Sequence, residues 1–261
     1  MHLIGEKLNS SIPKTLEAMQ SWDEKTLIGL IRSQADGGAD FLDINTALTG
    51  DELPLMRRLV ELVCTHSSCG IMLDSPSPEV LCAVLEQIDG REVMINSITL
   101  DDRFTSLCRL AAEKGASIVC LPMEGRAIPA PAERLAAGGK LIKKLTSLGV
   151  PEERIYIDVL IEALATDQQA ARAALETIRL IKDAYPSVQT ICGLSNISFG
   201  LPGRIGLNSA FLAMAMHAGL DSAILDPTSK TMRHALAASN ALLGQDEFCM
   251  DYITVLREEI D

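Results

Sequence analysis

The feature that most constrains the fold is an alternation of short apolar runs with longer helical patterns, repeated eight times along the chain. Each apolar run has the length and the Val, Ile and Leu content of a buried strand, and a stretch with helical periodicity follows it. We expect strands over residues 2–5, 39–44, 70–73, 92–95, 117–121, 154–157, 188–194 and 222–225. We expect helices over residues 23–36, 53–65, 78–87, 101–114, 132–148, 167–184, 207–217 and 229–243, with an additional helical segment at 246–259.

This alternation predicts an α/β protein built as a (β/α)8 TIM barrel, because eight strand–helix units are the number that closes such a barrel. The composition agrees: 48% of the 261 residues are hydrophobic and only 3% are aromatic, as expected for aliphatic parallel strands buried on both faces. No linker or low-complexity segment interrupts the chain, so residues 1–261 are expected to form a single domain. A doubly wound open sheet has the same alternation and is the alternative fold.

Polar side chains follow nearly every expected strand at its carboxyl end, which is where barrel enzymes have their active sites. Carboxylates and carboxamides make up this set, which consists of Glu6, Asn9, Asn45, Asp74, Asn96, Asp158, Asn196 and Asp226. Each of them also has a purely structural interpretation as a helix N-cap. We interpret Asp101 and Asp226 mainly as caps. Asp74 and Asp158 do not immediately precede a helical pattern and are stronger candidates for function.

The residue types at the strand ends restrict the chemistry. A zinc site requires closely spaced His or Cys, and the cluster Cys64, His66 and Cys69 falls between a helix and the next strand, on the opposite face of the barrel. We therefore expect no metal, and the sequence has neither a glycine-rich phosphate loop nor a Ser-His-Asp set. Asp carboxylates accept paired N–H donors, and Asn amides both donate and accept. The set therefore suits the edges of an amino-pyrimidinone ring.

Charge and cysteine content argue against several classes of partner. The chain has 23 Lys and Arg against 35 Asp and Glu, a formal net charge of −12, which repels nucleic acid and anionic membranes. The seven cysteines are an odd number and are scattered, as in proteins of a reducing compartment. The amino terminus enters a strand at once, and no segment has the length of a transmembrane helix. We therefore expect a cytoplasmic protein.

Five motifs lie at the strand ends: Ile4-Gly5-Glu6-Lys7-Leu8-Asn9, Asp43-Ile44-Asn45, Leu73-Asp74-Ser75, Ile95-Asn96-Ser97 and the stretch from Gly193 to Pro202. In this order, and across nearly the whole chain, they resemble the motifs of the pterin-binding methyltransferase family. That family includes methyltetrahydrofolate:corrinoid methyltransferases and the folate-binding domain of cobalamin-dependent methionine synthase. The last of the five motifs is the most specific.

The resemblance implies a barrel whose mouth binds the pterin of tetrahydrofolate. It implies that Asp74, Asn96 and Asp158 hold the pterin ring and that Asn196 hydrogen-bonds N5, the atom that carries the methyl group. Asn196 and Asp158 are thus the candidate catalytic residues. The remaining candidate folate contacts are Glu6, Asn9, Asn45, Gly193, Ser195 and Arg204.

The resemblance also implies partners. A separate corrinoid protein would carry cobalamin and dock over the barrel mouth. The methyl group would pass from 5-methyltetrahydrofolate to cobalt, or from methyl-cobalt to tetrahydrofolate. A homodimer is expected as well, to which the segment 246–259 contributes.

One loop departs from the family pattern. Residues 122–129 include Arg126 where the family usually carries a more acidic loop, so contacts to the folate tail or to the partner are expected to differ. Arg204 and Lys7 are candidates for pairing with the glutamate tail of folate, against the ordinary role of exposed cations as solvated surface groups.

Two alternative functions remain at this point. Dihydropteroate synthase is the nearest, but it should carry basic residues after the last two strands to handle diphosphate. This chain has Gly193-Leu194-Ser195-Asn196 and Leu225-Asp226-Pro227 there. The alternative outside enzymes is a non-catalytic folate-binding subunit of a corrinoid protein complex.

Overall fold

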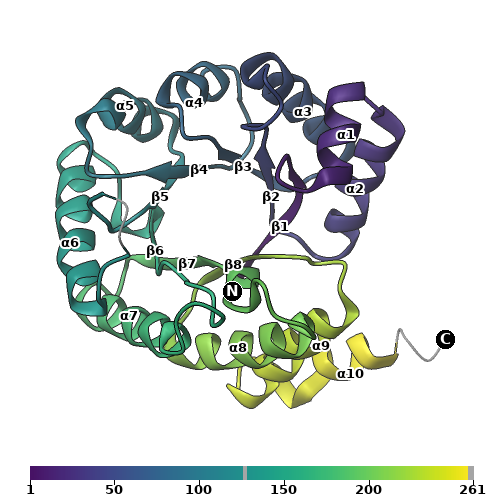
Figure 1. Cartoon of the computed structure of the whole chain (residues 1–261), viewed down its shortest axis with the longest axis vertical. Helices are drawn as coiled ribbons and strands as arrows, with labels where there is room; N and C mark the ends of the chain where they lie inside the picture. Colours follow the sequence, from purple (N-terminus) through teal and green to yellow (C-terminus); the bar gives the residue numbers. More distant parts are fainter. Residues whose placement is uncertain (126–127, 258–261) are drawn as a thin grey trace.

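Eight parallel strands close into a barrel (Figure 1). The structure is a computed structural model that describes residues 1–125 and 128–257. Within these residues each strand pairs with the next, and β1 pairs with β8. The strands are β1 (His2–Asn9), β2 (Phe41–Asn45), β3 (Gly70–Asp74), β4 (Val93–Ile98), β5 (Ser117–Cys120), β6 (Ile155–Asp158), β7 (Gln189–Gly193) and β8 (Ser222–Leu225). The closed order confirms the predicted barrel and excludes the open sheet, which would leave two unpaired edges.

A ring of helices surrounds the barrel (Figure 1). The helices of the described chain are α1 (Pro13–Ser21), α2 (Glu24–Asp36), α3 (Glu52–His66), α4 (Pro78–Leu85), α5 (Thr105–Lys114), α6 (Pro131–Ser147), α7 (Ala170–Ala184), α8 (Arg204–Ala218), α9 (Lys230–Leu242) and α10 (Met250–Arg257). Short 3-10 helices are η1 (Asp102–Phe104), η2 (Glu152–Arg154), η3 (Leu194–Ser198) and η4 (Glu247–Cys249). None of the helices in the described residues is long and apolar enough to cross a membrane.

Strand and helix boundaries differ from the sequence-based expectation in a few places with local causes. The pattern does not predict α1, a nine-residue helix that ends where Trp22 adopts a left-handed conformation with φ of 51°. α7 begins at Ala170 rather than at residue 167, because the Asp167 carboxylate accepts the Gln169 amide in a turn before the helix. The expected segment at 246–259 consists of η4 and α10, and its last two residues lie outside the described residues.

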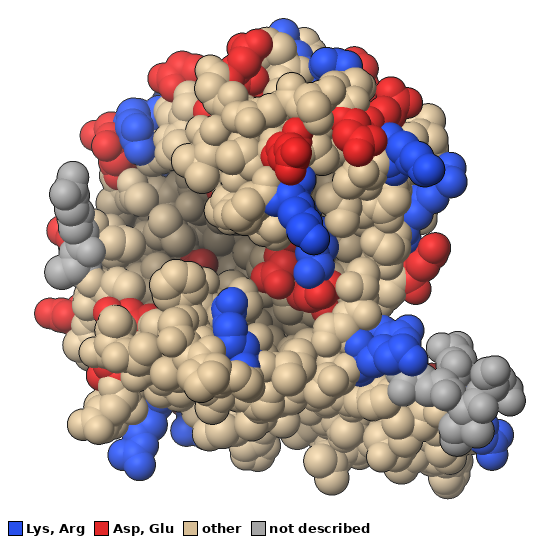
Figure 2. All heavy atoms as spheres, turned by 45° about the vertical axis from the view of Figure 1, so that its right-hand side comes forward, with Lys and Arg blue, Asp and Glu red and all other residues tan. Residues whose placement is uncertain are grey.

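The inner face of the barrel changes from apolar to polar along the strands. The apolar layer takes one residue from each strand: Ile4, Phe41, Met72, Met94, Val119, Tyr156 and Ile191, with Ile224 packed against them. Side chains alternate between the two faces of a strand, so a residue two positions later also points inward. Those positions hold Asp43, Asp74, Asn96 and Asp158. Polar side chains therefore meet at the carboxyl end, where Figure 2 shows a hollow with acidic atoms inside it.

β1 has an irregularity at Glu6 and Lys7, where its pairing with β2 shifts register between Gly5 and Leu8. The Lys7 amide donates to Oε1 of Gln34, 2.8 Å away, instead of to the neighbouring strand. Gln34 is fully buried on α2. A Cβ atom on Gly5 would lie 2.5 Å from that same Oε1, so only glycine admits the Gln34 side chain here.

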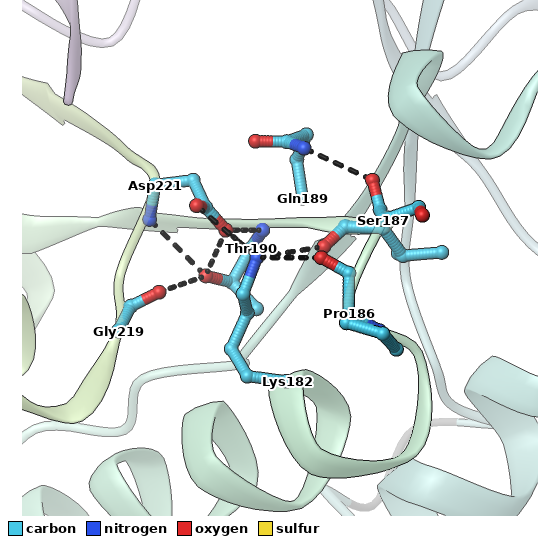
Figure 3. A network of polar contacts seen from close by, with 8 residues as sticks. Lys182, Pro186, Ser187, Gln189, Thr190, Gly219 and Asp221 are labelled. Atoms are coloured by element: carbon cyan, nitrogen blue, oxygen red, sulfur yellow. Dashed lines mark hydrogen bonds and ion pairs between the residues drawn. The ribbon is translucent and has the colours of Figure 1, made fainter.

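A polar network ties β7 to β8 at the amino-terminal end of the barrel (Figure 3). Nζ of Lys182, on α7, lies 3.2 and 3.0 Å from the two carboxylate oxygens of Asp221, which directly precedes β8. Asp221 Oδ2 also accepts the amide and the hydroxyl of Thr190 on β7, at 2.8 and 3.0 Å. Lys182 and Asp221 are each only 24% exposed, so this ion pair is shielded and multiply hydrogen-bonded.

Replacing Asp221 with Ala is expected to lower the free energy of unfolding by about 2 to 3 kcal/mol, because the partly buried Lys182 and Thr190 lose their acceptor. The matched control is Asp89→Ala. The Lys114–Asp89 pair has the same 3.0 Å separation, but its carboxylate is 88% exposed, and it is expected to contribute less than about 0.5 kcal/mol. Urea denaturation measures both losses. Equal losses would show that the network adds nothing beyond a surface ion pair.

Candidate active site

Adjacent strands bring a carboxylate and two amides together in the mouth of the barrel. Asp74 of β3 lies in register with Asn45 of β2 on one side and with Asn96 of β4 on the other. The Asn45 amide donates to Asp74 Oδ2 at 2.8 Å, and its oxygen accepts the Ser10 hydroxyl at 2.9 Å. Burial raises the pKa of Asp74 to about 6, against the lowering effect of the Asn45 hydrogen bond. Asn45 therefore orients this carboxylate and stabilises its charge.

Asp43 is a buried carboxylate beneath this group that the sequence analysis does not single out as a site residue. It is 2% exposed, and its Oδ1 has no hydrogen-bond partner among the residues that the structure describes. Burial, followed by the charges of Asp74 and Glu6, raises the pKa of Asp43 well above its usual range, and hydrogen bonds from Asn96 and Asn9 offset this only in part. The alternation of β2 is the signal that identifies Asp43, because it lies two residues before the inward-facing Asn45.

Asp158 stands at the end of β6, where its Oδ1 accepts the Leu160 amide at 2.7 Å. Burial raises the pKa of Asp158 to about 6, while this hydrogen bond and the charge of Arg134 lower it. Arg134 reaches in from α6, is 3% exposed, and donates to the carbonyl of Val159 at 2.6 Å. No sequence signal points to Arg134, which lies within an ordinary helical pattern.

Asn196 occupies η3, the turn that directly follows β7. It is exposed, and none of the described residues hydrogen-bonds its side-chain amide. A Cβ atom on Gly193 would approach Asn196 Nδ2 to 3.0 Å, which is tighter than an ordinary contact. Gly193 therefore leaves room for the Asn196 amide above the end of β7.

The cations proposed for the folate tail are engaged with the protein. Arg204 donates through Nη2 to the Ser195 carbonyl at 2.7 Å and through Nε to the Ser198 hydroxyl at 3.0 Å. Lys7 Nζ lies 2.7 Å from Asp226 Oδ2. Both cations therefore hold loops of the mouth together.

The interpretation of Asp101 as a cap is confirmed, since its carboxylate accepts the Arg103 amide at the start of η1. The interpretation of Asp226 as a cap is wrong: Ser229 caps α9, and Asp226 instead pairs with Lys7 and accepts the Thr228 amide. The reason is that a turn of two residues separates Asp226 from the cap position.

A cavity of about 250 Å³ opens beside these groups, lined by Glu6, Ser195, Arg204, Asn208, Asp226 and Met232. Burial raises the pKa of Glu6, and the Ser195 hydroxyl, 3.1 Å from its Oε2, partly offsets this. Figure 2 shows Lys and Arg side chains at the rim of the hollow and acidic ones within it. The mouth is thus rich in hydrogen-bond acceptors.

The remaining sequence candidates lie elsewhere. Cys69 donates its thiol to the Ala39 carbonyl, and His66 contacts Arg32, so both belong to the opposite end of the barrel. Across residues 1–125 and 128–257, no group of three or more His, Cys, Asp or Glu is arranged to hold a metal ion. Arg126 lies outside the described residues.

The fold is a closed eight-stranded barrel that carries Asp74, Asn96 and Asp158 at the carboxyl ends of its strands. A cavity lined by Glu6 and Asp226 opens beside them. Residues 5–226 match the family described as pterin binding enzyme, and the chain belongs to this family, as the motifs predict.

Individual relatives agree with this assignment. The chain is 31% identical, over 99% of its own length and 97% of the relative's, to a methylcorrinoid:tetrahydrofolate methyltransferase from Eubacterium limosum. It is 39% identical to methionine synthase from Mycobacterium tuberculosis over 85% of this chain, which corresponds to 20% of that larger protein. A crystal structure of dihydropteroate synthase from Stenotrophomonas maltophilia superposes with a TM-score of 0.65 over 92% of each chain, at 20% identity, and shares the fold.

The raised pKa of Asp158 makes stability depend on pH in a defined direction. Since the pKa is about 6 in the folded chain and 3.8 ordinarily, the ionised carboxylate opposes folding fully above about pH 6 and ceases to do so as the pH falls towards 3.8. Asp158→Asn keeps an acceptor for the Leu160 amide. It is expected to raise the free energy of unfolding of the ligand-free protein by about 1 to 2 kcal/mol near pH 8, because the side chain is partly accessible and the full shift is not realised.

Denaturation of Asp158→Asn and the wild type, compared between about pH 5 and pH 8, measures this gain. The gain should shrink as the pH falls. A gain of the same size at both ends of the range would mean that charge burial is not its cause.

Proposed function

We propose that the chain transfers a methyl group between N5 of tetrahydrofolate and the cobalt of a corrinoid carried by a partner protein. The observation that carries this proposal is the convergence of Asp74, Asn96 and Asp158 on one mouth beside the unbonded amide of Asn196. The similarity over nearly the full length of the chain to a methylcorrinoid:tetrahydrofolate methyltransferase supports it.

In this proposal Asp74 and Asp158 accept the ring N–H and exocyclic amine of the pterin, and Asn96 meets a mixed edge of the same ring. Both carboxylates have a pKa of about 6, so they are mostly ionised at neutral pH and act as acceptors. Asn45 supports this contact from behind, because it is bonded to Asp74, whereas the Asn9 oxygen accepts the Ser11 amide in a local turn. Affinity for the pterin should fall as the pH drops below about 6.

The chemical difficulty is that N5 is a poor leaving group. In one direction the N5–methyl bond breaks and its electron pair stays on nitrogen, which takes up a proton, while cobalt(I) supplies the pair for the new cobalt–carbon bond. The reverse direction passes through the same transition state. Asn196 can accept from protonated N5 or donate to unprotonated N5 without titrating, so it stabilises charge as it develops. Asp158 supports the proton through hydrogen-bonded solvent.

A diphosphate-releasing reaction, as in dihydropteroate synthase, is less well supported. Lys7 is paired with Asp226, and Arg204 is bound to the loop after β7. Glu6 and Asp226 line the adjacent cavity, so a polyanionic leaving group would meet repulsion rather than stabilisation.

The proposal also covers the oligomeric state and the cellular location of the protein. A second copy of the chain would cover Phe248 of η4 and Met250 at the start of α10, which are 84% and 58% exposed, in a homodimer to which this segment contributes. All seven cysteines are free, which suits the reducing cytoplasm.

Replacing Asn196 with Ala is expected to lower the rate of methyl transfer by about a hundredfold, because one preorganised group at the developing charge is lost. The dissociation constant for tetrahydrofolate should stay within about threefold, since the pterin ring is held from other strands. Asp158→Ala should instead abolish tight binding.

Calorimetric titration with tetrahydrofolate and 5-methyltetrahydrofolate, together with a methyl-cobalamin assay in both directions, checks these outcomes. A wild-type protein that binds neither folate would contradict the proposal. Folate binding without any transfer to a corrinoid protein would favour the non-catalytic subunit.

Docking of the corrinoid protein can be tested at the exposed apolar residues Phe199 and Leu48. They are 68% and 63% exposed and lie on the loops that follow β7 and β2, at the mouth. Phe199→Glu is expected to raise KM for the corrinoid protein by about tenfold or more, because a charge would be buried on docking, while the rate with free cobalamin stays unchanged. Met214→Glu on α8, 51% exposed, is the matched control and should change neither value. Equal effects on protein-bound and free cobalamin would place Phe199 outside the docking surface.

A further inference from the structure

The Asn196 side chain depends on its backbone for its position. Its amide is exposed, and no other described residue hydrogen-bonds it. An amide that must meet one ring nitrogen is sensitive to small displacements, since a misplacement of about 1 Å costs up to about a hundredfold in rate. The contacts that hold η3 in place therefore contribute to the proposed role of Asn196.

Three contacts close the loop around η3 upon itself. Arg204 binds the Ser195 carbonyl at 2.7 Å and the Ser198 hydroxyl at 3.0 Å, and the Ser198 hydroxyl donates to the same carbonyl at 3.3 Å. A fourth contact, from the Leu164 amide to the Ile197 carbonyl at 3.0 Å, ties the far end of the turn to the loop after β6. These contacts fix the shape of the turn and hold one side of it against the loop after β6.

On the other side, a side-chain hydrogen bond ties the turn to β1. The Ser195 hydroxyl donates to Glu6 Oε2 at 3.1 Å, across 189 positions of sequence. Glu6 lies at the irregularity of β1, next to the Lys7 amide that Gln34 binds, so its own backbone is fixed. Ser195 also directly precedes Asn196, which makes this bond the nearest anchor of the reactive amide to the barrel wall.

We infer that Ser195 and Glu6 are positioning residues for Asn196: their hydrogen bond holds η3 at the height at which the amide reaches N5. The inference rests on the proposed function and gives these two residues a task other than direct contact with folate. Ser195 uses both its hydroxyl and its carbonyl on protein partners, which leaves little of it to bind a ligand.

Ser195→Ala removes the bond to Glu6 and keeps the backbone carbonyl of residue 195 that Arg204 binds. It is expected to lower kcat by about tenfold, while KM and the calorimetric Kd for tetrahydrofolate stay within about twofold, because the loss falls on the transition state. Amide hydrogen exchange of the peptide spanning 194–199 should become faster. Ser195→Thr keeps a hydroxyl and should recover most of the rate.

Glu6→Ala should give a similar loss of kcat, and the double variant with Ser195→Ala should lose little more, because both remove the same contact. Ser33→Ala is the control, since its hydroxyl also donates to a nearby carbonyl, that of Leu30, but on the outer helix α2. It should leave rate and exchange unchanged.

Unchanged kcat together with unchanged exchange in Ser195→Ala would overturn the inference. A raised Kd at constant kcat would also overturn it, because Ser195 would then contact folate directly. Additive losses in the double variant would do the same. If the wild-type protein binds no folate, the proposed function fails, whereas the exchange data still decide whether the Ser195–Glu6 bond holds η3.

Discussion

Closure of the barrel is the constraint on which the rest of the structure depends. Once β1 pairs with β8, every strand must face one side inward, and the period of two then decides which side chains share the interior. The apolar layer from Ile4 to Ile224 packs together in the lower part of that interior. The polar side chains above it are partly or fully buried, and this burial raises the pKa values of Asp43, Asp74 and Asp158.

The two ends of the barrel differ in their electrostatics. Carboxylates crowd together at the mouth, where burying charge opposes folding, and Asn45 and the Leu160 amide compensate only part of that cost. At the other end the Lys182–Asp221 pair is also bonded to Thr190 and to the Val188 carbonyl, and it ties β7 to β8. A ligand rich in N–H donors would relieve the crowding at the mouth, so binding and folding are thermodynamically linked in this protein.

Much of this arrangement could be predicted from the sequence, for a physical reason. Strand ends are marked by apolar runs that stop at Asp or Asn, so residues such as Asp74 and Asp158 could be placed at the mouth from pattern alone. Asp43 is harder to identify as a site residue, because it lies within its apolar run and only the alternation of faces indicates its position. Arg134 and the Gln34 contact could not be found, because both depend on how a helix packs against the barrel, which no local pattern encodes. The pairing of Lys7 with Asp226 likewise requires the closed seam between the first and last strands.

The Gln34 contact means that the mouth and the outer helical layer are not independent parts. A glutamine on α2 completes the backbone of β1 next to Glu6, and Gly5 must remain without a side chain for it to do so. Loops of the mouth can therefore be exchanged to alter ligand preference, as in other barrels. The segment from β1 to α2, in contrast, should be kept together in a chimera with a related barrel, because a crossover point between residues 7 and 34 would separate the Lys7 amide from the Gln34 side chain that binds it.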